Sequence, residues 1–220
     1  MAKKKANCQL LKDIKLIEKK GRDKRMIKNW RPISLLNVDT KLLTKSLASK
    51  LSNVLPKLIN PDQTAYVKNR FIGESARLIS DILDLTKKMN IDGYLVTVDI
   101  EKAFDSMDHN FLFSVLMKFG FGTSWIKWIR VILNKQDSCV LNGGITSSYF
   151  TLYRGARLGD PISAYLFILV HEVLFILIRS NNKIERITIF KNSYKLTSYA
   201  DDATSFMKNK GSIELLMESY

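Results

Sequence analysis

The chain has 220 residues, of which 46% are hydrophobic and 25% are charged. This composition is typical of a folded globular protein and excludes a disordered tail, a collagen-like chain and a small disulfide-stapled protein. The formal net charge is +14: residues 1–30 contribute +8, residues 31–70 contribute +5 and residues 71–220 contribute +1. A basic first third joined to a charge-balanced remainder predicts a region that binds a polyanion, attached to a body with another role. A solvated basic tail is the alternative.

Two further features bear on where the protein works. Cys8 and Cys139 are far apart and no CxxC pair occurs, which predicts a reducing intracellular compartment, nuclear or cytoplasmic, and not secretion. No apolar stretch follows the first lysines, so no signal peptide is expected. The longest apolar run, residues 162–178, carries His171 and Glu172 in its middle, which predicts a helix buried in the protein and no membrane partner.

Hydrophobic periodicity predicts helices and strands mixed along the chain. Extended segments are expected at residues 12–20, 25–37, 94–98, 138–141, 148–153, 186–190 and 194–207. Helices are expected at residues 39–55, 73–89, 108–118, 123–133, 161–179 and from 212 onward. Pro56 is expected to end the first helix. This order predicts an α+β fold, in which strands distant in the sequence form a small antiparallel sheet backed by helices.

Carboxylates stand at two ends of predicted strands. Asp99 follows an apolar strand that is expected to be buried, and Asp201 with Asp202 is expected at the tip of a hairpin. Adjacent carboxylates repel each other unless cations are present, and Mg²⁺ is bound by a few carboxylates with water and phosphate oxygens. Two ions about 3.5–4 Å apart, shared by Asp99 and Asp201, would suit nucleotidyl transfer. An ordinary polar hairpin turn is the alternative.

Six blocks in order make the chain similar to the reverse transcriptases of non-LTR, LINE-type retrotransposons, over residues 12–210. These blocks are NWRPISLLN at 29–37, KLLTK at 41–45, QTAYVKNR at 63–70, VDIEKAFD at 98–105, RGARLGDPIS at 154–163 and YADD at 199–202. The resemblance implies an RNA-directed DNA polymerase that adds dNTPs to a primer 3′-OH on an RNA template, with two Mg²⁺ ions or Mn²⁺ in their place. It also implies basic fingers at 1–90 and a palm at 91–220.

The resemblance assigns roles to twelve residues. Asp99 and Asp201 match the metal-binding pair, Asp202 matches the adjoining carboxylate, and the backbone of Ile100 lies beside the metals. Phe104 matches the aromatic residue that excludes a 2′-OH, with a core aromatic as the alternative. The remaining matches are finger residues near the template or triphosphate, Arg31, Lys41 and Arg70, and loop residues at the template–nucleotide pair, Arg154, Gly155 and Gly159. Leu158 matches a position beside the incoming nucleotide.

Two departures from the family pattern lower the expected activity. Leu158 stands where the family usually has glutamine, whose amide can hydrogen-bond near the nucleotide. The chain also ends soon after the YADD block, so neither a thumb nor an endonuclease is expected within these residues, and the fragment should be a poor or inactive polymerase. The alternatives are a nucleic-acid-binding remnant without catalysis, a group II intron maturase-like protein and, less supported, an unrelated two-metal nuclease. His109 and His171 are expected to be a surface and a packed histidine, respectively.

Overall fold

The computed structural model describes residues 12–133 and 136–220, which form two compact units. The first unit joins the described residues up to Lys50 to Phe104–Phe167, and the second joins Leu51–Ala103 to Ile168–Tyr220. Each unit therefore combines two separate segments, whereas the predicted boundary between fingers and palm is a single one near residue 90. The fingers and palm assignments stay predictions.

A five-stranded mixed sheet forms one side of the first unit. It is built from β1 (Lys12–Glu18), β2 (Trp30–Leu35), β4 (Gln136–Asn142), β5 (Ile145–Thr146) and β6 (Phe150–Leu152). The order is β2-β1-β4-β5, with β6 also paired to β4. β1 and β2 are antiparallel, whereas β1 and β4 run parallel with Asp13 opposite Cys139. A short 3₁₀ helix, η2 (Ile27–Asn29), lies in the connection from β1 to β2.

Helices supply the core of the first unit. α5 (His109–Lys118) begins after Asp108, whose side chain caps it by accepting a hydrogen bond from the Phe111 amide at 2.9 Å. α6 (Thr123–Leu133) has buried residues at helical spacing, so one face is apolar. Leu112, Leu116 and Ile129 of these helices are completely buried. The short α4 (Ala103–Ser106) precedes them.

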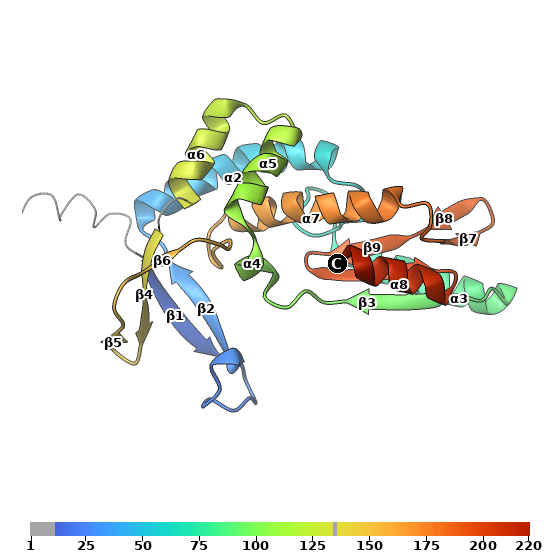
Figure 1. Cartoon of the computed structure of the whole chain (residues 1–220), viewed down its shortest axis with the longest axis horizontal. Helices are drawn as coiled ribbons and strands as arrows, with labels where there is room; N and C mark the ends of the chain where they lie inside the picture. The colour runs from blue at the N-terminus through green and yellow to red at the C-terminus, as the bar shows by residue number, and fades with distance from the viewer. Residues whose placement is uncertain (1–11, 134–135) are drawn as a thin grey trace, which may run out of the picture. The chain divides into compact units, whose positions relative to one another are not determined.

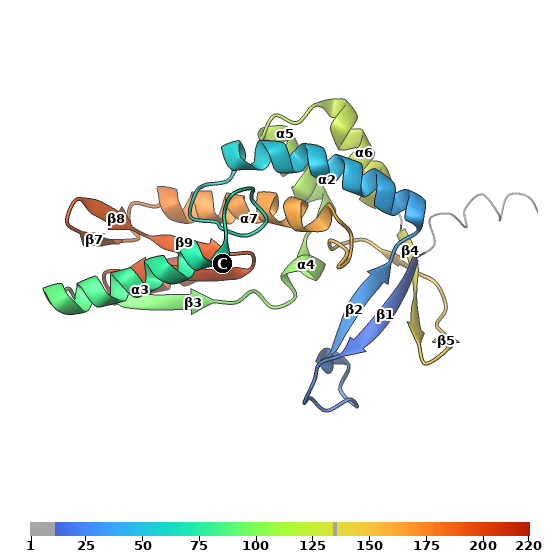
Figure 2. The same cartoon turned by 180° about the vertical axis from the view of Figure 1, so that it is seen from behind.

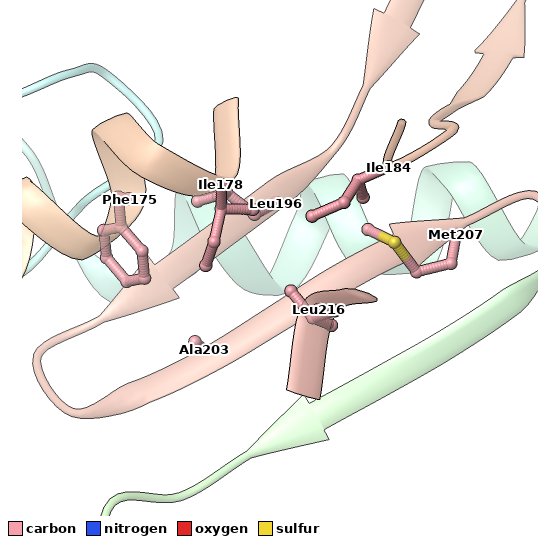
Figure 3. Packing of buried hydrophobic residues seen from close by; sticks show 7 residues of the cluster. All are labelled: Phe175, Ile178, Ile184, Leu196, Ala203, Met207 and Leu216. Atoms are coloured by element: carbon pink, nitrogen blue, oxygen red, sulfur yellow. The ribbon is translucent and has the colours of Figure 1, made fainter. Parts of the chain in front are cut away.

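The second unit contains a three-stranded antiparallel sheet in the order β3-β10-β9, formed by β3 (Tyr94–Val98), β9 (Leu196–Tyr199) and β10 (Asp202–Met207). Residues alternate along β10, so Ala203 and Met207 enter one hydrophobic cluster and Phe206 enters another on the opposite face. Figure 3 shows the first cluster, in which Phe175 and Leu216 also take part.

Helices cover both faces of this sheet. α8 (Lys210–Ser219) lies in front of the sheet in Figure 1, and α3 (Ile72–Met89) lies in front of it when the view is reversed in Figure 2. A small hairpin, β7 (Ile187–Ile189) with β8 (Asn192–Tyr194), extends the unit. The prediction of an α+β fold with a small antiparallel sheet backed by helices is confirmed.

Two long helices, α2 (Val38–Leu58) and α7 (Ser163–Ser180), contribute residues to both units. The carboxyl end of α7 is held by Lys195, whose ammonium group donates hydrogen bonds to the carbonyls of Ile178, Arg179 and Asn181 at 3.0, 3.2 and 2.8 Å. Such a lysine satisfies carbonyls that a helix end leaves without an intrahelical donor.

Several local predictions need correction. Pro56 lies inside α2, which continues to Leu58, because the lost N–H affects only one hydrogen bond in the last turn. The strand at 94–98 forms as predicted but is not buried, since β3 is at the edge of its sheet and Tyr94 and Leu95 are exposed. α7 begins at Ser163, two residues later than expected.

Two predictions concern the apolar helix and the cysteines. α7 is long and apolar enough to cross a membrane by length and composition, but half of its residues are buried within the protein, as in a core helix. Phe175 and Ile178, for example, are completely buried. Cys139 is a buried free thiol, and Cys8 lies outside the described residues.

Candidate active site

The predicted catalytic carboxylates lie at one end of the sheet of the second unit. Asp99 directly follows β3, and a two-residue turn of Ala200 and Asp201 joins β9 to β10, where Tyr199 pairs with Asp202. β3 and β10 pair with Val98 opposite Ala203, so continuing this register by one residue brings Asp202 alongside Asp99. Figure 3 shows the end of β3 and the β9–β10 turn at the same end of the sheet. The predicted hairpin tip is therefore present.

The three carboxylates form a locally negative edge. Burial raises the pKa of Asp202 above its usual value, and the negative charges of Asp201 and Asp99 raise it further. Within residues 12–133 and 136–220, no ion pair is formed by any of the three. In the same ranges, no three His, Cys, Asp or Glu side chains converge into a ready metal site. The three carboxylates therefore share one edge of the sheet.

Two side chains from elsewhere in the second unit hold the turn that carries Asp201. Gln63 donates from Nε2 to the Ala200 carbonyl at 3.1 Å and accepts from the Ala200 amide through Oε1 at 3.0 Å. His171 donates from Nδ1 to the same carbonyl at 3.1 Å. Burial lowers the pKa of His171, although the Ala200 carbonyl and Asp201 oppose the shift. His171 is the packed histidine that we predicted, but its contact with the turn was not foreseen.

An ion-paired cluster lies beside this region. Arg179 donates to both carboxylate oxygens of Asp62, at 3.0 and 2.9 Å, and to Glu172. Glu172 is only 2% exposed. Burial raises the pKa of both acids, and the positive charge of Arg179 counteracts the shift. Asp62 precedes Gln63, so this cluster fixes the start of the segment that reaches the turn.

Comparison with known proteins now places the chain in a family. The family model described as "Reverse transcriptase (RNA-dependent DNA polymerase)" matches residues 17–220. The chain belongs to the reverse transcriptase family. A transposon TX1 uncharacterized 149 kDa protein from Xenopus laevis is 33% identical over 192 residues, which are 86% of this chain and 14% of the relative.

Other relatives agree with this assignment. The Pol polyprotein of the R2DM retrotransposable element of Drosophila melanogaster is 24% identical over 86% of this chain and 18% of its own length. Telomerase from Candida tropicalis, solved with a fragment of telomeric RNA, shares the fold with a TM-score of 0.65 at 14% identity, covering 96% of this chain and 38% of that one. This chain thus spans less than a fifth of the two transposon proteins, and its likeness to LINE-type reverse transcriptases is confirmed.

The RGARLGDPIS block of this chain packs tightly within the first unit. Gly155 has a φ of +93°, and a Cβ there would lie 3.1 Å from the Asp105 carbonyl oxygen and 3.3 Å from that of Phe104. The Gly155 amide donates to the Met107 carbonyl at 2.8 Å. Glycine is thus required for a close approach to the backbone of the VDIEKAFD block.

A histidine secures the same loop. His109 donates from Nε2 to the Gly155 carbonyl at 2.9 Å and is half-buried, so it is not the surface histidine that we expected. Arg154 is exposed and lies 3.6 Å from Asp108. Gly159, with a φ of +100°, approaches the Ser34 carbonyl oxygen, and the Leu158 carbonyl accepts from the Ser34 amide at 3.0 Å. The Leu158 side chain is 37% exposed.

The other predicted nucleotide-site residues are spread over both units. Phe104 is half-buried and stacks on Phe167 with ring centroids 4.5 Å apart, so it is not a fully enclosed core aromatic. Ile100 is half-buried one residue after Asp99, and Arg31 in β2 and Lys41 in α2 are exposed. All of these roles stay predictions.

Arg70 has a different environment from the free cation that the family role suggests. Its guanidinium donates to the carbonyls of Ile59, Asn60 and Gln63, at 3.0, 2.6 and 2.9 Å. Its donors therefore fix the loop after α2 in this structure, and contact with a triphosphate stays a prediction.

Proposed function

We propose that this chain is the fingers-and-palm part of an RNA-directed DNA polymerase that extends a DNA primer on an RNA template. The observation that carries the proposal is the position of Asp99, Asp201 and Asp202 at one end of an antiparallel sheet, in a chain of the reverse transcriptase family. The primer 3′-hydroxyl would lose its proton to solvent, and its oxygen would form a bond to the α-phosphorus of a dNTP. The bond from that phosphorus to the bridging oxygen would break, and pyrophosphate would leave with its electrons.

The donor set fits divalent metal ions. Three carboxylates that form no ion pair in the described part of the chain offer the hard oxygen ligands that Mg²⁺ prefers. Two such ions, when bound, stabilise the attacking and leaving oxygens of an in-line displacement. Asp99, Asp201 and the Ile100 carbonyl would hold them, with Asp202 adjoining.

The other candidate functions are less well supported. The relatives found are transposon and retrotransposon proteins, which favours the LINE-type assignment over a maturase. A binding remnant without catalysis is suggested only by Leu158. Primer extension on poly(rA)·oligo(dT) distinguishes the polymerase from the binding remnant. A polymerase extends the primer when Mg²⁺ is present, whereas a remnant binds the duplex without extending the primer.

Replacing Phe104 with valine should weaken the exclusion of ribonucleotides. If the ring blocks a 2′-OH by its bulk, the smaller side chain should improve the ratio of kcat/KM for UTP over dUTP by roughly 10–100-fold, the range for filling or vacating a small volume. Phe111→Val, an equal change at an exposed ring on α5, is the control. An unchanged ratio together with a lowered Tm would instead make Phe104 a packing residue.

Duplex binding should depend on the connection between β1 and β2. A deletion of residues 1–28 would remove the cations of this connection together with β1, which lies between β2 and β4 in the sheet. Because such a deletion would disrupt the sheet, point substitutions are the better test. Lys24 and Arg25 are already ion-paired with Glu18 and Asp23, whereas no side-chain partner is described for three other exposed cations of this region, Lys20, Arg22 and Lys28.

Replacing these three with glutamine should weaken binding to an RNA–DNA duplex and flatten its salt dependence. The slope of log K against log salt should fall by about 0.7–0.9 for each phosphate that the variant no longer neutralises. The exposed lysines Lys87, Lys88 and Lys191, also changed to glutamine, remove three charges as well and control for net charge. Equal slopes in both variants would show that this connection is not part of the binding surface.

A further inference from the structure

The turn that carries Asp201 has a conformation that its sequence does not favour. Ala200 has a φ of +58°, whereas a two-residue hairpin turn with positive φ at its first position normally has glycine there. A Cβ is crowded against the backbone in the left-handed region, so alanine adopts it only when its surroundings impose it. Contacts outside the turn must therefore maintain this conformation.

Gln63 provides those contacts in an unusual way. A single amide side chain accepts from the N–H and donates to the C=O of the same residue, Ala200, so the orientation of both flanking peptide groups is fixed. Gln63 is 1% exposed, which protects both bonds from competition by water. His171 adds a third bond to the Ala200 carbonyl and packs on Phe175 with ring centroids 4.3 Å apart.

The segment around Gln63 is itself anchored. The Ser198 amide donates to the Asp62 carbonyl at 2.8 Å, and the Thr64 amide donates to the Ser198 carbonyl at 2.9 Å, so this segment runs parallel to β9. Arg70 donates to the Gln63 carbonyl, and the Ala65 amide donates to the Gln63 Oε1 at 2.9 Å. The bonds from Gln63 and His171 to Ala200, which we call the clamp, thus involve a segment that extends the sheet and is itself held by hydrogen bonds.

We propose that Gln63 and His171 are positioning residues that hold the Ala200–Asp201 turn in a strained conformation and thereby aim the Asp201 carboxylate at the divalent ions. Neither side chain needs to touch substrate or metal. The proposal rests on the proposed function for its consequence, because only a metal-binding Asp201 makes the aim of the turn matter. The clamp itself can be tested separately.

The first experiment measures Mn²⁺ binding by the electron paramagnetic resonance signal of the free ion. Asp201→Asn should abolish Mn²⁺ binding. Gln63→Met, which removes both bonds at similar volume, should weaken the affinity for Mn²⁺ by at least about tenfold. Adding Ala200→Gly should restore affinity to within about threefold, because glycine adopts positive φ without the clamp. Lys195→Met, a change to another buried polar side chain of the same unit, should lower Tm without changing Mn²⁺ affinity.

The histidine provides an independent pair of variants. His171→Asn places an amide donor near the position of Nδ1 and should retain most of the affinity, whereas His171→Leu should lose several-fold. Equal Mn²⁺ affinities in Gln63→Met, His171→Leu and the parent protein, or a failure of Ala200→Gly to rescue Gln63→Met, would overturn the proposal.

Hydrogen exchange distinguishes a failed clamp from a failed function. The Ala200 amide, whose acceptor is Gln63, should exchange about 10–100-fold faster in Gln63→Met than in the parent, whereas Lys195→Met should leave its rate relative to the neighbouring sheet unchanged. If the parent shows no Asp201-dependent Mn²⁺ binding, the proposed function is wrong, and the exchange rate of the Ala200 amide alone then tests whether the clamp holds the turn. An unchanged Ala200 exchange rate in Gln63→Met would show that the clamp does not hold the turn.

Discussion

Replacing Arg179 with methionine should lower the free energy of unfolding by about 3–5 kcal/mol at neutral pH, the usual cost of removing one partner from a buried ion pair. Arg179 is the shared partner of Asp62 and Glu172, whose side chains are 15% and 3% exposed. Methionine keeps much of the volume but leaves both carboxylates without their cation. Urea unfolding of the parent and the variant measures the loss.

The loss should shrink as the pH falls. Burial raises the pKa of Asp62 and Glu172 and Arg179 counteracts it, so the pKa of each rises further in the variant. A carboxyl whose pKa is higher in the folded state favours folding when it is protonated, and this contribution disappears as the pH rises through the folded-state pKa. The variant should therefore be less destabilised at pH 5 than at pH 7.

Arg77→Met is the matched control for this experiment. Arg77 is exposed and forms a 3.6 Å pair with Asp81 one helical turn away, so its loss should cost about 0.5 kcal/mol or less with little pH dependence. Equal losses for the two arginine variants would show that the buried cluster is not a stabilising feature of the second unit.

Replacing Asp201 with asparagine should reduce the rate of nucleotide addition by about 10³-fold in a preparation that extends a primer. A bound metal contributes several kcal/mol of charge stabilisation, and about 1.4 kcal/mol corresponds to a factor of ten. Asparagine has the same shape, so the turn should persist. Single-turnover primer extension at saturating dNTP measures the chemical step.

The control for Asp201→Asn is Asp84→Asn, the same chemical change at an exposed position of α3. The Asp201 variant should also have a Tm at least equal to that of the parent without Mg²⁺, because one of the repelling charges that raise the pKa of Asp202 is gone. An addition rate within threefold of the parent would contradict the catalytic role of Asp201.

Local patterns predicted the site's frame well. The strand that ends before Asp99 and the hairpin tip at Asp201 follow from apolar stretches interrupted by polar residues, and both form where expected. The exposure of β3 could not be predicted in this way, because it depends on which strand ends up at the sheet edge. An apolar strand has the same pattern at an edge and at the centre.

The contacts that hold the turn were beyond sequence reasoning for a related reason. Gln63 and Ala200 are 137 positions apart, and nothing in either local sequence indicates the pairing of residues 62–64 with β9. Arg70 likewise looked like a free cation because its three carbonyl acceptors come from a loop whose path depends on the whole unit. The positive φ of Ala200 was equally invisible, since alanine rarely adopts it.

The interleaving of the two units has a consequence for synthesis on the ribosome. β1 ends at Glu18, but its parallel partner β4 begins only at Gln136, and β3 must likewise wait for β10. At about 5–20 residues per second, β1 emerges roughly 6–24 s before β4. During that interval one edge of the β1–β2 ribbon has no partner strand. Nascent chains of this protein should therefore depend on chaperones more than chains whose sheets close locally.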